Sequence, residues 1–160
     1  MTHSCRFVTT LGTAIGVAFL AGFVSLPARA ALGGDAASVD ADVAKMKGQK
    51  RATAAAGYTV SEITLPSGTV LREYVSPGGK VFAVTWSGMT PPDLQQTLGT
   101  YYETAKAAAA TARQTGGGHN HLSIRQDDLV VVSGGHMRAL RGKAYVPSLL
   151  PPNFQLDEIK

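Results

Sequence analysis

The sequence predicts an α+β domain in which an antiparallel sheet of about five to six strands carries two helices packed on one face. Short segments rich in β-branched and aromatic residues are separated by brief Pro/Gly turns. Two longer segments place apolar residues at helical spacing. The resulting order is α-β-β-β-α-β-β-β. Runs of neighbouring hairpins with separate helices are typical of an α+β domain.

The first thirty residues have the pattern of a secretory signal. A short positive start that includes Arg6 precedes an uncharged apolar run, Phe7–Leu26. Pro27-Ala28-Arg29-Ala30 follows, with small residues at the two positions that a signal peptidase recognises. We therefore predict cleavage after Ala30, a single mature domain over residues 31–160, and a periplasmic or secreted location without a membrane-spanning segment. The alternative is a retained anchor, because about 20 apolar residues can span a bilayer.

Cleavage would restrict the chemistry open to the protein. The single cysteine, Cys5, lies in the signal, so the mature chain could form neither disulfides nor thiolate metal sites. Of 15 basic residues, Arg6 and Arg29 would be lost, which leaves 13 basic against 11 acidic residues and a net charge of about +2. Because nucleic-acid binding usually needs a concentrated basic face, we expect no nucleic-acid partner.

The first half of the mature chain predicts one helix and three strands. Residues 35–47 place apolar side chains at near-helical spacing, with acidic residues early and lysines late, as the helix dipole favours. The Ala/Thr-rich segment Lys50–Gly57 is interpreted as a linker. Pro-Ser-Gly and Pro-Gly-Gly turns then separate three antiparallel strands. These strands are Tyr58–Leu65, Thr69–Val75 and Lys80–Trp86.

The third of these strands is apolar on both faces. Side-chain alternation places Phe82, Val84 and Trp86 on one face. Val81 and Ala83 then line the other face. Such a strand is typical of the covered centre of a sheet, so we expect its aromatic side chains in the core. The alternative is an exposed aromatic cleft for a sugar or a peptide.

The second half predicts a long helix, three strands and an irregular tail. Thr90-Pro91-Pro92-Asp93 has the composition of a capped helix start, and the helix is expected from Pro91 to about Arg113. The Pro-rich tail, residues 147–160, is apolar but lacks regular structure. It either packs across the sheet or is offered to a partner. The three strands between helix and tail are predicted at His121–Arg125, Leu129–Ser133 and Met137–Val146.

Several separated segments of the mature chain resemble one known family. These segments are Ala31–Gly34, Leu65–Tyr74, Gly79–Gly88, Pro92–Leu94 and Gly99–Tyr102. In order and content they are similar to a family of small exported proteins of Gram-negative bacteria, catalogued as domain of unknown function 2844. The resemblance covers essentially the whole mature chain. It implies export and a single domain, and it brings no catalytic or binding residues with it.

Three histidines form the most specific chemical pattern. His119 and His121 are two residues apart in Gly-Gly-Gly-His-Asn-His, so on a strand their side chains would share a face. His136 follows the Gly134-Gly135 turn. Together the three imidazoles could hold Zn²⁺ or Cu²⁺. The alternative is a set of solvated side chains in a glycine-rich loop and no cofactor.

A second, weaker pattern surrounds Ser133. Val-Val-Ser-Gly-Gly resembles part of a nucleophile elbow, with His136 and Asp127 or Asp128 nearby in the sequence. The first glycine of that motif is missing, and no strand-to-helix transition follows. A catalytic triad is defined by geometry rather than by nearness in sequence. A small hydrolase is therefore the second alternative function, and the simpler interpretation is a strand that ends in a turn.

The leading expectation is a non-catalytic binding or accessory module of the cell envelope, with an envelope protein as partner. The reason is mostly negative, because the cysteine would be lost, the acidic residues are scattered and no catalytic constellation is present. Arg138, Arg141 and Lys143, with Arg125 nearby, form the densest basic cluster, whose simpler interpretation is the charged face of an edge strand. The alternative is contact with anionic lipid, a glycan or an acidic partner. The feature that favours a binding role is the apolar side chains of the tail, which could contact a partner. These are Leu149, Leu150 and Phe154.

Overall fold

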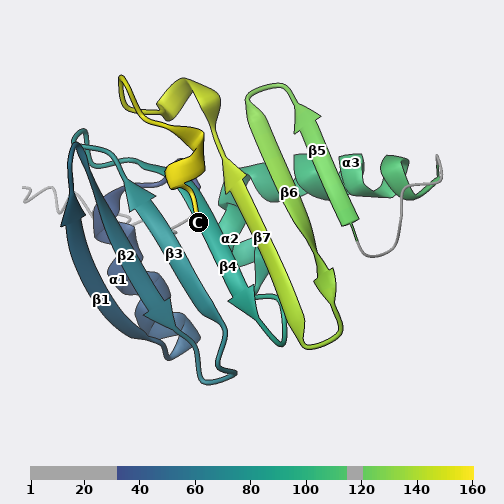
Figure 1. The fold of residues 1–160 in the computed structure, drawn as a ribbon, viewed down its shortest axis with the longest axis horizontal. Helices are drawn as coiled ribbons and strands as arrows, with labels where there is room; N and C mark the ends of the chain where they lie inside the picture. Colours follow the sequence, from purple (N-terminus) through teal and green to yellow (C-terminus); the bar gives the residue numbers. More distant parts are fainter. Residues whose placement is uncertain (1–31, 115–120) are drawn as a thin grey trace, which may run out of the picture.

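The computed structural model describes residues 32–114 and 121–160, which form a seven-stranded antiparallel sheet (Figure 1). The helices cover one face of this sheet, and the tail lies across the opposite face. We call these the helix side and the tail side. The predicted export signal, residues 1–30, and the predicted metal ligand His119 lie outside the described residues.

The elements follow one another in two hairpin runs joined by helices. In chain order they are α1 (Ala36–Met46), β1 (Gln49–Ala55), β2 (Tyr58–Thr64), β3 (Val70–Val75), β4 (Val81–Gly88), α2 (Leu94–Leu98), the 3₁₀ turn η1 (Gly99–Tyr101), α3 (Tyr102–Gln114), β5 (His121–Gln126), β6 (Leu129–His136), β7 (Ala139–Tyr145), and the 3₁₀ turns η2 (Pro147–Leu149) and η3 (Leu156–Glu158). None of the helices in the described part of the chain has the length and apolar character needed to cross a membrane.

The strands lie in the order β1-β2-β3-β4-β7-β6-β5. β1 to β4 form a meander, the chain crosses the helix side through α2 and α3, and β5 to β7 return so that β7 pairs with β4. Every neighbouring pair is antiparallel. The predicted α+β class and antiparallel sheet are confirmed, whereas the predicted number of five to six strands and the order α-β-β-β-α-β-β-β are wrong.

The additional strand is β1, which occupies most of the predicted linker Lys50–Gly57. Its seven residues are all exposed, so the apolar alternation that marks a strand in a sequence is missing. β1 pairs along its whole length with β2, across the tight connection Ala56-Gly57. Pairing with an adjacent strand, rather than burial of its own side chains, therefore forms this edge strand.

The single helix predicted from Pro91 to Arg113 is divided into α2, η1 and α3. The division occurs at Gly99, whose φ of 53° and ψ of −120° are not helical. The helix also begins later than predicted, because Asp93 is its N-cap and accepts a hydrogen bond from the backbone N–H of Gln96 at 3.1 Å. As a result, α2 and α3 are two short helices that pack separately on the helix side.

A β-bulge changes which residues of β4 share a face. Tyr74 pairs with Ala83 and Val75 pairs with Val81, so Phe82 is the extra residue. Phe82 and Ala83 both join the tail-side core, whereas Val81 joins the helix-side core. The prediction that Phe82 shares a face with Val84 and Trp86 is therefore wrong, because simple alternation allows no extra residue. The predicted burial is confirmed, with Phe82 0% and Trp86 5% exposed.

A carboxyl group is buried in the helix-side core. Glu73 of β3 is 1% exposed, and neither of its carboxyl oxygens has a hydrogen-bond partner within the described structure. The neighbouring α1 carries a second buried acid, Asp42, which accepts a hydrogen bond from Gln96 of α2. Burial first, and the charge of Asp42 second, raise the pKa of Glu73 to about 8, against a lowering effect of Lys50.

We expect Glu73→Gln to remove a pH dependence of stability. Burial raises the pKa of the Glu73 carboxyl to about 8 in the folded state, against its ordinary value of 4.5 in the unfolded chain. The folded state therefore binds more protons between these values, so wild-type stability falls as the pH rises from about 4.5 to about 8. The full loss over this range is on the order of 5 kcal/mol.

Urea unfolding of both proteins at pH 5 and pH 9 measures this difference. The variant is expected to lose less stability than the wild type between the two pH values. The exposed Glu103→Gln serves as the control and is expected to follow the wild type. Equal losses in wild type and Glu73→Gln would contradict the assignment.

Candidate functional site

The tail crosses the sheet on the side opposite the helices (Figure 1). Leu149, Leu150 and Phe154 are partly buried against the tail-side core, and Ile159 is buried in it. Of the two sequence alternatives for the tail, the structure therefore has the tail packed across its own sheet. The apolar side chains predicted to bind a partner contact residues of β2, β3, β4 and β7 instead of projecting from the surface.

Aromatic rings hold the middle of the tail. The ring of Phe154 lies 4.9 Å from that of Phe82 and 5.1 Å from that of Tyr58, with interplanar angles of 74° and 81°. Edge-to-face pairs of this kind add to the effect of burial. Phe82 reaches this cluster because of the bulge in β4. The bulge therefore places the residue on which the tail packs.

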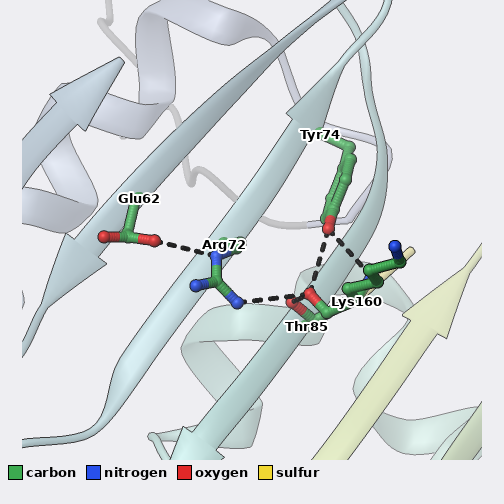
Figure 2. A network of polar contacts seen from close by, with 5 residues as sticks. All are labelled: Glu62, Arg72, Tyr74, Thr85 and Lys160. Carbon is green, nitrogen blue, oxygen red and sulfur yellow. Dashed lines mark hydrogen bonds and ion pairs between the residues drawn. The ribbon is translucent and has the colours of Figure 1, made fainter. Parts of the chain in front are cut away.

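Polar contacts hold the end of the tail (Figure 2). The main-chain oxygen of Lys160 accepts hydrogen bonds from Thr85 Oγ1 at 3.0 Å, Tyr74 Oη at 3.1 Å and Arg72 Nη1 at 3.3 Å. The backbone N–H of Lys160 donates to Tyr74 Oη at 3.1 Å. Arg72 is oriented from its other side by Glu62 Oε2, 2.8 Å from Nε. This part of the sheet can therefore bind an oxygen acceptor through several fixed donors.

A further side-chain contact joins the tail to β2. Tyr58 Oη donates a hydrogen bond to Glu158 Oε2 at 2.7 Å. This bond, followed by burial and the negative charge of Glu158, raises the pKa of Tyr58 to about 12. The contact adds to the aromatic packing of Tyr58 against Phe154, so this tyrosine holds the tail at two points.

Beside Lys160, the tail side contains an open hollow of about 790 Å³. Its described lining includes four Lys or Arg residues, one histidine, and no Asp or Glu. The five residues are Arg72, His121, Arg141, Lys143 and Lys160. Apart from the pair between Arg72 and Glu62, none of them forms an ion pair with a carboxylate of the described residues. We call this group of five residues the basic surface.

The strand register explains the shape of this hollow. Ser87 of β4 lies opposite Arg141 of β7, Arg141 lies opposite Gly134 of β6, and Gly134 lies opposite His121 of β5. Because neighbouring strands are about 4.8 Å apart, Arg141 and His121 stand roughly 10 Å apart. Gly134 lies between them and has no side chain to fill the space. Lys143 lies two residues along β7 and, by alternation, on the same side.

The helix side has a second hollow, of about 870 Å³, at the same end of β6 and β7. Trp86 lines both hollows. One edge of its ring lies so close to Gly142 that a Cβ atom on residue 142 would be 2.1 Å from Cζ2 of Trp86. Met137 is 95% exposed in the β6–β7 turn and Met89 is 58% exposed after β4. Basic residues surround this hollow as well. They are Arg113, His121, His136, Arg138 and Arg141.

Two of the three predicted metal ligands lie in the described part of the chain. His121 and His136 are both exposed and line the helix-side hollow. His119 lies outside the described residues. Within residues 32–114 and 121–160, no three His, Cys, Asp or Glu side chains are grouped so that they could hold a metal ion. Binding of Zn²⁺ or Cu²⁺ stays a prediction from the sequence.

The residues of the hydrolase alternative lie apart. Ser133 pairs with Gly142 in β7, near one end of β6. Asp127 and Asp128 lie in the turn at the other end of β6, and Asp128 accepts hydrogen bonds from the backbone and hydroxyl of Ser148. Ser133 lies five residue steps along the chain from Asp128, a distance of roughly 16 Å in an extended strand. The structure therefore does not bring the serine and these carboxyls together.

Sequence reasoning found part of the basic surface. It selected Arg141 and Lys143 from their closeness in sequence, and it named Arg138, which lies exposed in the β6–β7 turn with a φ of 69°. It missed Arg72 and Lys160, because neither belongs to a local cluster of charge. The row Glu62-Arg72-Thr85-Lys143 follows from strand pairing, and a correct strand order would have identified it.

We expect Phe154→Ala to destabilise the fold by about 2 kcal/mol, because it removes a partly buried ring from contact with Phe82 and Tyr58. Urea unfolding measures the change in free energy. Leu156→Ala, which truncates an exposed tail residue, is the matched control and is expected to have a small effect. Similar losses for both variants would contradict the specific packing of Phe154.

Comparison with curated proteins and with solved structures gives no match. The family model described as "Protein of unknown function (DUF2844)" matches residues 28–159, most of the chain and both halves of the sheet. The family resemblance predicted from the sequence is thereby confirmed, and the chain belongs to the DUF2844 family of proteins of unknown function.

Proposed function

We propose that this protein is a non-catalytic binding module of the cell envelope, exported to the periplasm or beyond, which binds an anionic envelope component through its basic surface. The observation that carries the proposal is the tail-side hollow. Four Lys or Arg residues and His121 surround it, and no acidic residue is found in its described lining. A negatively charged ligand would relieve the mutual repulsion of these groups.

The position of β7 in the sheet supports a binding role. The alternative interpretation of Arg141 and Lys143 is that they protect an edge strand from unwanted pairing. β7, however, pairs with β4 on one side and with β6 on the other. Its charges therefore have no edge to protect. The net charge of about +2 expected for the mature chain is a sum over all residues, so it does not reveal this concentration of positive charge on one part of the surface.

The backbone positions of the basic surface are set by the sheet, and one of its side chains, that of Arg72, is held on two sides. Its residues project from β3, β5 and β7 and from the end of the tail. Arg72 is oriented by Glu62 on one side and by the main-chain oxygen of Lys160 on the other. For Arg72, a ligand that meets an already oriented donor loses less free energy to ordering of the side chain. Partner contact through Leu149, Leu150 or Phe154 would instead require the tail to leave its own sheet, so we assign the contact to the basic surface.

The test uses the protein expressed from its full-length sequence as bait in an envelope extract, with chemical crosslinking. We expect a specific partner to be captured by the wild type and lost from Arg141→Ala/Lys143→Ala. The matched control is Lys80→Ala/Lys106→Ala, which removes the same charge from exposed side chains outside the basic surface. This control is expected to retain the partner. Raised salt should weaken the capture, because exposed charges are screened.

Capture of the same partners by all three proteins would contradict the assignment to the basic surface. Turnover of a substrate by the purified protein, lost in Arg141→Ala/Lys143→Ala, would contradict the non-catalytic role. Circular dichroism and urea unfolding of each variant establish that a lost partner does not reflect a lost fold.

A further inference from the structure

We propose that the floor of the tail-side hollow, above Gly134, is a subsite for a phosphate group. The phosphate would lie between Arg141 and His121 and within reach of Lys143 and Ser87. This inference rests on the proposed function and names the ligand chemistry of the same surface. It applies to free inorganic phosphate and to a phosphate monoester on a larger molecule, because both present the same tetrahedral group of oxygens.

The shape of the hollow fits a group of this size. The register places Arg141 and His121 on either side of Gly134, and all three line the hollow. Two strand spacings, roughly 10 Å, separate the backbones of the two flanking residues. Because Gly134 has no side chain, an anion can approach the sheet backbone there while both flanking side chains reach over it.

The donors fit a tetrahedral oxyanion better than a carboxylate. Arg141 offers a planar guanidinium that can bind two oxygens at once, and Lys143 adds a compact charge with three donors. Ser87, directly opposite Arg141, adds a hydroxyl. A phosphate directs its oxygens to several sides and can engage these groups together, whereas the acceptor sites of a carboxylate lie in one plane and face fewer of them.

The tail provides an internal example of the same chemistry. Further along the strands, Arg72, Tyr74 and Thr85 already share one oxygen acceptor, the main-chain oxygen of Lys160 (Figure 2). Thr85 lies opposite Lys143 in β7, so this occupied acceptor position adjoins the proposed subsite. The tail oxygen is bound by Arg72, Tyr74 and Thr85 and not by Arg141 or Lys143, so the positive charge of these two residues is left for an external anion.

The test titrates the protein, expressed from its full-length sequence, with inorganic phosphate and with acetate, and follows backbone amides by NMR. We expect phosphate to shift the amides of Gly134 and Arg141, and to bind at least several-fold more tightly than acetate. Arg141→Gln should weaken phosphate binding about tenfold, as loss of a charge-assisted bidentate contact does. The exposed Lys106→Gln is the matched charge control and should leave it unchanged.

Gly134→Val provides a second test that keeps every charge. A β-branched side chain suits a strand and would fill the floor of the hollow, so phosphate binding should fall as far as in Arg141→Gln while the fold is retained. If Gly134→Val bound phosphate as tightly as the wild type, the binding would be a diffuse attraction to positive charge, and the subsite would be overturned. Absence of phosphate binding to the wild type would do the same.

Vesicles distinguish the two sources of phosphate. Phosphatidylcholine vesicles that contain phosphatidic acid are compared with phosphatidylcholine alone. Binding to the first, in competition with inorganic phosphate, identifies a headgroup as a ligand of the subsite. Phosphate binding without vesicle binding identifies a soluble phosphate-bearing ligand. Vesicle binding that phosphate does not reduce would place the contact elsewhere and overturn the subsite.

Failure of this inference can be told apart from failure of the proposed function. If Arg141→Ala/Lys143→Ala loses its envelope partner but no protein binds phosphate, the binding module stands and the phosphate subsite fails. If all proteins retain the partner, the proposed function fails independently of any phosphate titration.

Discussion

The fold depends on a sheet whose centre is apolar on both faces. β4 contributes Val84 and Trp86 to the helix side and Phe82 and Ala83 to the tail side, and all four residues are buried. Apolar surface of this extent is stable only when it is removed from water. Two separate covers are therefore needed. The helices supply one, and the tail, which has no strand or α-helix of its own, supplies the other.

The proposed site lies at the end of the part of the sheet that the tail covers. Along β7, the tail-side residues change from Tyr145, which is buried, to Lys143 and Arg141, which line the hollow. The tail extends as far as Arg72 and Thr85 and there satisfies their donors with the main-chain oxygen of Lys160. Core and basic surface are thus successive parts of the same strands, so the packing of the tail also fixes the boundary of the site.

Local signals made the hairpins predictable, and non-local pairing made the rest hard to predict. Pro and Gly turns marked β2, β3 and β4, because a turn depends on a few adjacent residues. β1 lacked such a signal, since its alanine-rich residues gain their conformation from β2. The bulge at Phe82 and the division at Gly99 each depend on one residue. A periodic pattern is judged over many residues, so it does not detect a change at a single position.

The same distinction applies to the candidate site. Arg141 and Lys143 could be chosen from the sequence because they lie two residues apart. Their neighbours His121, Gly134 and Ser87 come from three other strands, and pairing of β7 with both β4 and β6 brings them together. Without the strand order, no spacing in the sequence indicates that a glycine lies between an arginine and a histidine.

The packing of the tail has a consequence for how the chain reaches its final state during synthesis. Tyr58, Tyr74 and Phe82 are made early, but their cover includes Phe154 and Ile159, which are made about 70 or more residues later. Contacts at such separation form slowly, because a long loop must close first. The tail-side core therefore stays open while most of the chain emerges from the ribosome. A chain that stops before Phe154 would therefore leave the apolar residues of β2, β3 and β4 on the tail side exposed to water.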